Sequence, residues 1–367
     1  MATIENNLLS ELRALRFSLA ASAKKGPPVH GLAERTLGRI ERCFMSPLRL
    51  AVLGEANSGK SLLINYLLRH QILPSGGFTG DNTEILIRYA REPSVHSIGM
   101  DGSRTRITSK AFGRLVKPEN RVVPRSGPAV IYDASASSDR SRPTPANMIF
   151  DGRRGAKQPI RLIEVGLPLD FLQRVEIIEV RSFPDVERTA PSKRAFRRVN
   201  LTVWCTLATQ AWKETEVLAW RRIPEAHRKG ALMLVTYKDA IRNSRDEAKI
   251  TARLRHAGST LFNDVALVSL RDAVQSLISG ESDASRLRTE SNIQTAENAI
   301  LAMIQNWQAH RLQKANRLLR LLAAQLGADG GKDRRAAASR EFAIRLERLG
   351  MEFLHASPSI SLSVAAA

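Results

Sequence analysis

Apolar residues follow two different rhythms along the chain. Near the amino terminus leucines recur every three or four residues between Leu8 and Leu19, which predicts an amphipathic helix over residues 8 to 20. The middle of the chain instead carries short continuous apolar runs of the length of a buried strand. The other helices are predicted at 32–44, 62–68, 212–222, 245–257, 293–326 and 334–354, and the strands at 48–53, 83–89, 159–165, 175–180, 201–207, 231–236 and 265–269.

Strands alternate with helices in the middle of the chain, which indicates βαβ units around a mostly parallel sheet. We therefore predict an α/β fold, a mostly parallel sheet flanked by helices, together with a helical bundle formed by the N-terminal and C-terminal helices. The predicted division is 1–46 for the first helices, 47–280 for the α/β domain, 281–356 for the last helices and 357–367 for a tail. Residues near 100–158 lack periodicity, which predicts a mobile insert. In such a sheet ligands bind beyond the carboxyl ends of the strands.

Composition narrows the class of protein. No apolar run reaches the roughly 18 to 20 residues that span a bilayer. The first residues include Glu5 and no basic region, which predicts that the chain has no signal peptide. Cys43 and Cys205 are too few for a disulfide framework or a cysteine metal site. The expected location is the cytoplasm, with peripheral attachment to the inner face of the membrane as a second expectation.

The chain has 367 residues and a formal net charge of +20, a surplus that is either matched by a partner or simply solvated. Anionic lipid headgroups, RNA and an acidic protein all remain open as partners. Basic residues are not interleaved with aromatic residues in the way that favours stacking on bases. Nucleic acid is therefore the partner that the sequence favours least.

An eight-residue Walker A motif stands between the first predicted strand and the helix that follows it. In such a loop the backbone N–H groups surround phosphate oxygens, Lys60 reaches the β and γ phosphates, and the Ser61 hydroxyl binds Mg²⁺. A turn without function is the alternative, which the strand and helix on either side argue against. The nucleotide-binding residues predicted here are Gly54, Glu55, Ala56, Asn57, Ser58, Gly59, Lys60, Ser61 and Leu62.

A second candidate element directly follows the sixth predicted strand. Its sequence, Thr236-Tyr237-Lys238-Asp239, has the form of the guanine-reading Thr/Asn-Lys-x-Asp element with tyrosine in place of the lysine. Asp239 would accept hydrogen bonds from the N1–H and amino groups of guanine, which adenine does not present in that arrangement. Ser269 follows the last predicted strand, where a further turn would support the same base. We therefore add Thr236, Lys238, Asp239 and Ser269 to the predicted nucleotide-binding residues, with a polar turn as the alternative.

These residues resemble the dynamin-like branch of the P-loop GTPases. The likeness lies in the sequence from Gly54 to Asn65, which is similar to the GxxNSGKSxxIN form common in bacterial members, and in the Leu-Pro-x-Gly form of residues 73–76. It spans roughly residues 45–280. The resemblance implies a P-loop GTPase-type sheet, bound GTP or GDP with Mg²⁺, a helical stalk, a homodimer through the nucleotide sites and action at an anionic membrane surface.

Several positions depart from the pattern of that family. Ungapped comparison places Asp81 where switch I should carry the threonine that binds Mg²⁺ and holds the attacking water. The resemblance leaves Thr79 and Thr83, on either side, as the switch candidates, and Lys60 as the third catalytic residue. Glu179 stands where an aspartate holds Mg²⁺ through water, and the glycine that contacts the γ-phosphate is missing after it.

The predicted function is that of a dynamin-like GTP-binding protein that hydrolyses GTP slowly to GDP and phosphate. Phosphate binding requires the loop, Lys60 and Mg²⁺, all of which the sequence provides for. Hydrolysis also requires a positioned water, for which the switch residues give weaker support. Two alternatives remain, a pseudo-GTPase whose bound nucleotide shapes a scaffold for a protein partner and a ribosome- or RNA-associated GTPase.

Overall fold

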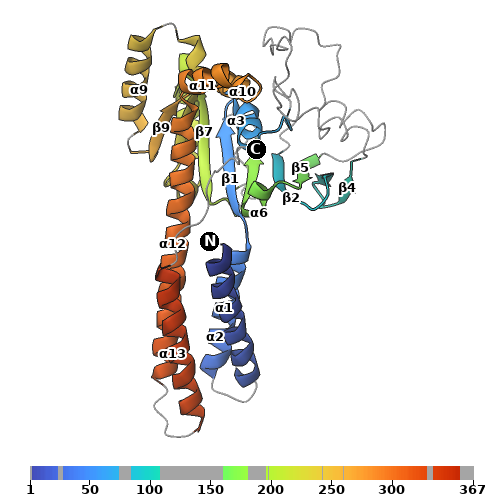
Figure 1. Cartoon of the computed structure of the whole chain (residues 1–367), viewed down its shortest axis with the longest axis vertical. Helices are drawn as coiled ribbons and strands as arrows, with labels where there is room; N and C mark the ends of the chain where they lie inside the picture. Colours follow the sequence, from blue (N-terminus) through green and yellow to red (C-terminus); the bar gives the residue numbers. More distant parts are fainter. Residues whose placement is uncertain are drawn as a thin grey trace. The chain divides into compact units, whose positions relative to one another are not determined.

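The chain divides into two compact units in a computed structural model. We call them the sheet unit (Leu48–Met303) and the helical unit (Met1–Pro47 with Ile304–Ala367). Figure 1 labels most of the elements named below. The structure describes residues 2–23, 28–73, 84–107, 160–180, 196, 198–241, 243–258, 260–328 and 334–355.

The sheet unit contains one nine-stranded sheet in the order β4-β3-β5-β2-β6-β1-β7-β8-β9 (Figure 1). From β6 to β9 all neighbours pair in parallel, as do β2 and β5, whereas β2 pairs with β6, and β3 with β5 and β4, in antiparallel fashion. The predicted α/β class with a mostly parallel sheet is confirmed. The strands are β1 (Leu48–Gly54), β2 (Glu84–Tyr89), β3 (Ser94–Gly99), β4 (Arg104–Arg106), β5 (Ile160–Leu167), β6 (Val175–Glu179), β7 (Leu201–Leu207), β8 (Leu232–Thr236) and β9 (Asp264–Leu267).

Helices connect these strands and flank the sheet. The first of them, α3, begins directly after the loop that leaves β1, as the strand–loop–helix order of the sequence predicts. The helices that lie wholly in the sheet unit are α3 (Lys60–Leu68), α6 (Asp170–Arg174), α7 (Glu214–Arg221), α8 (Glu225–Arg228), α9 (Ser244–Gly258), α10 (Leu270–Ser276) and α11 (Glu281–Glu290), with the 3₁₀ turns η3 (Ala208–Gln210) and η4 (Lys238–Ala240).

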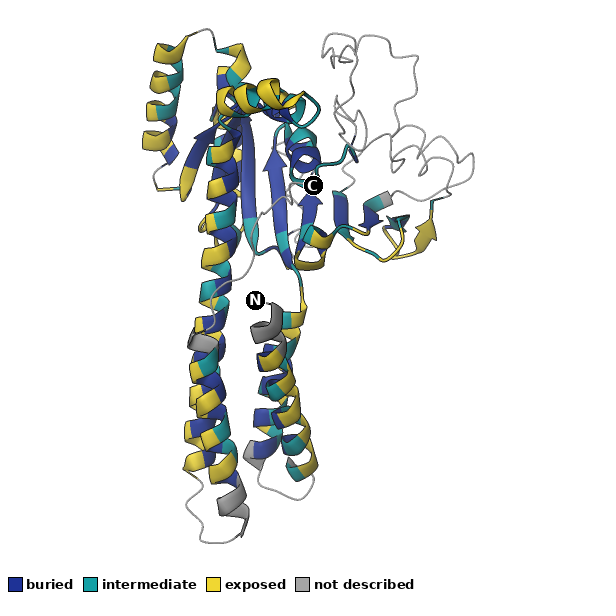
Figure 2. Cartoon of the chain, in the orientation of Figure 1, coloured by how far each residue is buried: buried dark blue, intermediate teal, exposed yellow. Residues whose placement is uncertain are grey.

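The centre of the sheet is buried. Strands β1, β7 and β8 consist almost entirely of buried residues (Figure 2), because continuous apolar runs can pack on both faces of a parallel sheet. Aromatic rings fill part of this core. Trp220 stacks on Phe262 with ring centroids 4.4 Å apart and meets Trp204 edge-on at 5.5 Å. This packing holds the loops at the carboxyl ends of β7 and β8 on a rigid base.

The helical unit contains α1 (Ala2–Ala23), α2 (Pro28–Met45), the later part of α12 (Ile293–Gly327) and α13 (Arg334–His355). Their apolar stripes face one another, so that Leu12 and Leu15 of α1 and Leu319 and Leu326 of α12 are fully buried in one cluster. The predicted bundle of N-terminal and C-terminal helices is therefore confirmed. No helix among the described residues is long and apolar enough to cross a bilayer.

Besides the two 3₁₀ turns, six short elements were not predicted: β3, β4, α6, α8, α10 and α11. β3 and β4 lie at the edge of the sheet, where β4 is exposed throughout and carries no apolar pattern. α6 and α10 have 5 and 7 residues, too few to establish a helical period. β4 lies at the start of the predicted insert, and the rest of that insert, residues 108–158, lies outside the described residues.

Candidate functional site

The Walker loop leaves β1 at Gly54, a position that only glycine can occupy. Its φ is +138°, and an added Cβ would lie 2.1 Å from the carbonyl oxygen of Cys205 on β7. Gly59, which precedes α3, has a φ of +86°, and a Cβ there would lie 2.9 Å from Leu270. Asn57 also has a positive φ, +59°. The loop therefore lies in close contact with the neighbouring strand and with α10, and its backbone conformation depends on glycine at both positions.

Lys60 is the first residue of α3, and its side chain lies inside this loop. Its ammonium group donates hydrogen bonds to the carbonyl oxygens of Gly54, at 3.0 Å, and Glu55, at 2.6 Å, and the residue is only 6% exposed. Ser58 closes the loop by donating to the carbonyl oxygen of Glu55 at 2.8 Å. A buried positive charge and the amino-terminal end of a helix therefore converge on one small region, which suits a phosphate group.

Ser61 and Glu179, the two predicted metal residues, lie side by side. The Ser61 hydroxyl donates to the Glu179 carboxylate at 3.0 Å. The sheet register explains the meeting, because β1 and β6 are parallel neighbours that pair Val52 with Glu179, and both strands end at the same edge. A hydroxyl and a carboxylate oxygen are hard ligands of the kind that Mg²⁺ takes when phosphate and water complete its coordination. The residues present fit Mg²⁺, while no group of three acidic, histidine or cysteine ligands occurs among the described residues.

The predicted base-reading residues are also brought together. The Ser269 hydroxyl donates to the Asp239 carboxylate at 3.0 Å and accepts a hydrogen bond from the backbone N–H of Asp272 at 3.2 Å. Asp239 is otherwise exposed, so its carboxylate can receive further donors. Thr236 fixes this side of the site to the Walker loop, because its buried hydroxyl lies 3.1 Å from the Ser58 carbonyl oxygen.

Lys238 has other partners. Its ammonium group donates to the carbonyl oxygen of Glu290 at 2.9 Å and forms an ion pair with Glu247 at 3.2 Å. It therefore joins the base-side loop to α9 and to the end of α11. Tyr237, which stands at the lysine position of the guanine-reading pattern, has a φ of +61° and is partly buried.

The switch candidates Thr79 and Thr83, like Asp81 between them, lie outside the described residues. The structure also identifies contacts that the sequence did not predict. Glu55 forms an ion pair with Lys213 at 2.7 Å and accepts a hydrogen bond from Thr215 at 2.8 Å. These partners are about 160 positions away along the chain, and no local spacing marks such a pair.

Comparisons with known proteins give neither a family nor a curated relative. No known protein family matches the chain, and no curated protein matches its sequence.

Solved structures give distant likenesses. Two matches come from an oligomerised bacterial dynamin pair described as sensing and tethering membranes. Their identities are 14% and 15%, they cover 80% and 88% of this chain, and their TM-scores are 0.42 and 0.45. Era in complex with MgGDPNP and part of 16S ribosomal RNA matches at 11% identity over 75% of this chain and 68% of its own, with a TM-score of 0.35. LeoA, a bacterial dynamin GTPase from ETEC, matches at 10% identity over 89% of this chain and 56% of its own, with a TM-score of 0.37. This chain spans 43% and 58% of the two dynamin chains.

Proposed function

We propose that the chain binds GTP with Mg²⁺ in the Walker loop and hydrolyses it slowly to GDP and phosphate. The observation that carries the proposal is the meeting of Ser61 with Glu179 at 3.0 Å beside a loop that encloses Lys60. A Walker loop followed by a helix serves phosphate, and a hydroxyl–carboxylate pair next to it serves the cation that accompanies a nucleoside triphosphate. Asp239 with Ser269 would select guanine.

In this proposal each residue has a separate task. Lys60 offers a positive charge to the phosphates, and the backbone N–H groups of the loop orient them. Ser61, directly, and Glu179, through a water, would hold Mg²⁺, which would supply further positive charge near the phosphates. Thr79 or Thr83 holds the water that attacks the γ-phosphate in line. The Lys213 ammonium forms an ion pair with Glu55 at 2.7 Å and so joins the loop after β7 to the Walker loop.

GTP turnover by the purified full chain tests this reading, with Lys60→Ala as the control. We expect slow phosphate release by the wild-type chain and a fall of about 10²- to 10³-fold in the variant, because a donor aimed at developing charge is lost. Ser61→Ala should lower turnover and raise the Mg²⁺ concentration needed for it. Nucleotide binding with release equal to that of Lys60→Ala would instead support the pseudo-GTPase scaffold.

Base choice can be tested by reversing one hydrogen bond. Asp239→Asn replaces an acceptor by an amide that can donate, so the variant should lose affinity for GTP and gain affinity for XTP, whose base carries a carbonyl where guanine has its amino group. The loss of a hydrogen bond to a charged group costs about 1.5–3 kcal/mol. Ser269→Ala, which removes only the support of Asp239, should weaken GTP binding less. Equal affinity of the wild-type chain for GTP and ATP would contradict the base assignment.

Attachment to an anionic membrane is a further part of the proposal, supported by α12. This helix carries Lys314, Arg317 and Arg320 with exposed side chains, and no acidic residue lies between 298 and 328. Among the described residues none of these three takes part in an ion pair, whereas the arginines of α1 are paired with glutamates of α2. Basic residues at three-residue spacing repel one another mildly, so an anionic surface would relieve them.

A further inference from the structure

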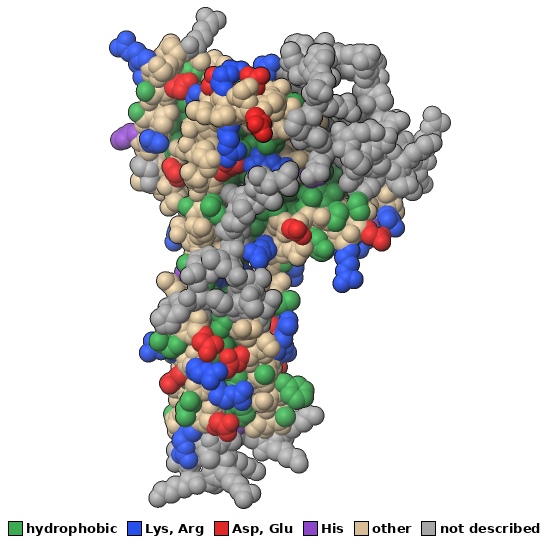
Figure 3. Space-filling model, viewed as in Figure 1, with side chains coloured by type: hydrophobic (Ala, Val, Ile, Leu, Met, Phe, Trp, Pro, Cys, Tyr) green, Lys and Arg blue, Asp and Glu red, His purple; other side chains and the backbone are tan. Residues whose placement is uncertain are grey.

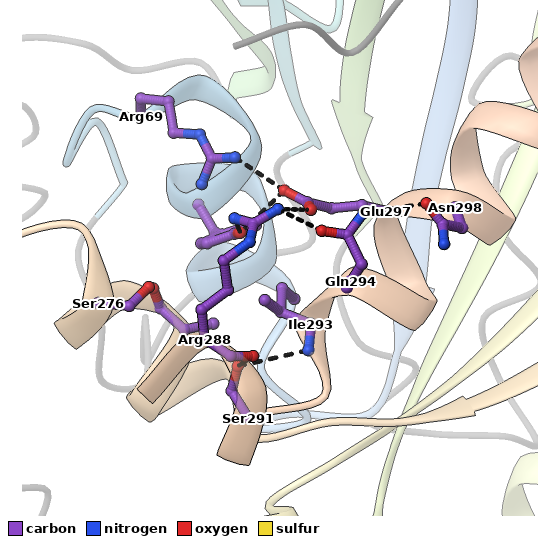
Figure 4. Close-up of polar contacts among 10 residues, drawn as sticks. Arg69, Ser276, Arg288, Ser291, Ile293, Gln294, Glu297 and Asn298 are labelled. Atoms are coloured by element: carbon purple, nitrogen blue, oxygen red, sulfur yellow. Dashed lines mark hydrogen bonds and ion pairs between the residues drawn. The ribbon is translucent and has the colours of Figure 1, made fainter. Parts of the chain in front are cut away.

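A second polar cluster lies at the end of α3 that is remote from the Walker loop. It joins three helices of the sheet unit, and we call it the Glu297 cluster: Tyr66 and Arg69 at the end of α3, Arg288 on α11 and Glu297 on α12. Figure 4 shows Arg69 and Arg288 converging on the carboxylate of Glu297. α3, which begins in the Walker loop, is thereby tied at its other end to the start of α12.

The contacts of the cluster are short and screened from water. Glu297 is 8% exposed and accepts from Tyr66 Oη and from Arg69 Nη2, each at 2.8 Å, and from Arg288. Arg288 also donates to Tyr66 Oη at 3.1 Å, and the guanidinium of Arg69 lies over the Tyr66 ring, 4.1 Å from its centroid. One carboxylate therefore serves two guanidinium groups, and its removal would leave both without their common counter-charge.

Arg69 occupies a backbone conformation that arginine does not favour. It caps the end of α3 with a φ of +54°, in the left-handed region where glycine is the usual residue. Glycine would make the same turn at lower conformational cost, so what arginine adds at this position is its side chain. The side chain of Arg69 contacts Glu297 and Tyr66.

The start of α12 is tied on its other side to the base-reading loops. The segment between α11 and α12 receives hydrogen bonds from Lys238 to the carbonyl oxygen of Glu290 and from the Ser269 backbone to that of Ser291, both at 2.9 Å. Asn292 donates back to the carbonyl oxygen of Leu267, at the end of β9, at 2.8 Å. The first turns of α12 are thus held by both halves of the nucleotide site, through α3 on the phosphate side and through Lys238 and Ser269 on the base side.

We propose that Arg69, Arg288 and Glu297 are positioning residues for the nucleotide, acting through α3 and the start of α12. The inference rests on the proposed function, since it takes a nucleotide to span the Walker loop and the Asp239–Ser269 pair. A bound nucleotide stabilises α3 and the start of α12 in one relative position. The Glu297 cluster holds them in that same position at the end of α3 that is remote from the Walker loop. By thermodynamic linkage the cluster then raises nucleotide affinity by the same factor by which the nucleotide stabilises the start of α12.

The test compares two pairs of variants of the full chain. Arg69→Gly removes the side chain and relieves the strained φ, whereas Arg69→Ala removes the side chain and keeps the strain. Glu297→Gln keeps the shape of the acceptor but removes its charge. Arg286→Gln is the control on α11, because Arg286 is exposed and its partners among the described residues are Asp283 and Glu290 of its own helix. The measurements are the dissociation constants for GTP and GDP, thermal unfolding, and amide exchange of residues 293–303 with and without GTP.

We expect GTP to slow amide exchange at 293–303 in the wild-type chain and in Arg286→Gln. In Arg69→Gly and Glu297→Gln this protection should be lost and GTP affinity should fall about 10-fold, which lies within the usual range of coupling between sites. Arg69→Gly should lose GTP affinity and protection even though it relieves the strained backbone at this position. Misfolding caused by backbone strain would therefore not explain the loss.

Two outcomes would overturn the inference. One is a folded Arg69→Gly or Glu297→Gln chain that binds GTP as tightly as the wild-type chain, which would make the cluster purely structural. The other is exchange at 293–303 that GTP does not change in the wild-type chain. A wild-type chain that binds no guanine nucleotide would instead refute the proposed function, and the two failures are therefore distinguishable.

Discussion

Glu216 is a carboxylate held inside the sheet unit by four donors. Trp204 Nε1 and Thr206 Oγ1 donate to it at 3.2 and 2.8 Å, and the backbone N–H groups of Trp212 and Lys213 do so at 2.8 and 3.3 Å. It thereby fixes the loop after β7 that carries Lys213 to Glu55 of the Walker loop. Burial raises the pKa of Glu216 above its ordinary value in spite of these donors. The folded chain therefore holds this proton more tightly than the unfolded chain.

Glu216→Gln should destabilise the chain by about 2 kcal/mol, because the amide nitrogen cannot accept from backbone N–H groups. The sign of the pH effect follows from the raised pKa. The free energy of unfolding of the wild-type chain includes a contribution that is lost as pH rises from the ordinary carboxyl range through the raised value. The variant lacks this contribution, so the gap between the two proteins should narrow as pH rises. Denaturant unfolding between pH 5 and pH 8 measures the difference in the free energy of unfolding between the two proteins. A difference that widens with pH would contradict the raised pKa of Glu216.

At the residue scale, the site residues that could be predicted from the sequence are those that stand at a fixed spacing along the chain. The glycines, Lys60 and Ser61 of the Walker motif stand at fixed offsets, and the structure places them at the end of β1, in the loop that follows and in the first turn of α3. Glu179 was found only through the resemblance. The pairs Glu55–Lys213 and Arg69–Glu297 could not be predicted, since they join residues far apart along the chain whose meeting depends on how the elements pack.

At the scale of elements, α3 is the helix to which the rest of the site is fastened. Besides Arg69, its buried Asn65 holds the chain that leaves the helix: the side chain donates to the Leu73 carbonyl oxygen at 2.7 Å and accepts from the N–H groups of Ile72 and Leu73 at 2.9 and 2.8 Å. One side chain thus replaces three backbone hydrogen bonds at the point where the chain departs towards Thr79 and Thr83.

Replacing Asn65 by alanine should loosen the segment at Ile72 and Leu73, where the chain leaves α3. We expect the free energy of unfolding to fall by about 2 kcal/mol, since the N–H and the carbonyl oxygen of Leu73 lose their partner in a buried place. The N–H of Ile72 keeps its hydrogen bond to the carbonyl oxygen of His70 at 3.0 Å. Amide exchange at Ile72 and Leu73 should accelerate. Asn306→Ala, on the exposed face of α12, is the matched control and should change stability by less than about 0.5 kcal/mol. Unchanged exchange at Ile72 and Leu73 would show that other contacts hold the segment.

Long elements were easier to predict than short ones. The leucine spacing of α1 and the long stripe of α12 cover many helical turns, so the period is unambiguous, and the buried strands β7 and β8 are continuous apolar runs. α10 and α11 escaped prediction because one is very short and the other, α11, is polar with no buried residue. Nevertheless α11, a helix that the sequence pattern did not predict, carries Arg288 and so contributes to the Glu297 cluster.

At the scale of the whole molecule, the surplus of positive charge is the feature that local contacts explain least. Figure 3 shows one face of the chain, on which basic and acidic side chains are interspersed, and the arginines of α1 are matched by glutamates of α2. α12 differs, because Lys314, Arg317 and Arg320 follow one another without an acidic residue. This stripe of exposed basic residues is the part of α12 on which the proposed attachment to an anionic membrane rests.

Co-sedimentation with vesicles tests the membrane part of the proposal. The full chain should bind vesicles rich in phosphatidylglycerol, with affinity that falls as salt rises, and should ignore pure phosphatidylcholine. Changing Lys314, Arg317 and Arg320 together to glutamine should weaken binding by roughly 3 kcal/mol, at about 1 kcal/mol for each basic residue near the surface. Arg286→Gln should have little effect. Binding that is insensitive to both salt and the triple substitution would reject the stripe as the contact.

The two cysteines lie in different units, so that each thiol can be alkylated as a label for its own unit. Cys205 is fully buried on β7 beneath Gly54, and burial raises the pKa of its thiol to about 12, so it should resist alkylation while the strand is in place. Cys43, on α2, is exposed. In a Cys43→Ser chain, the alkylation rate of a single thiol reports how often the strand beside the Walker loop opens. A thiol that the chain already carries thus measures how often the strand beside the Walker loop opens, without the introduction of a new cysteine.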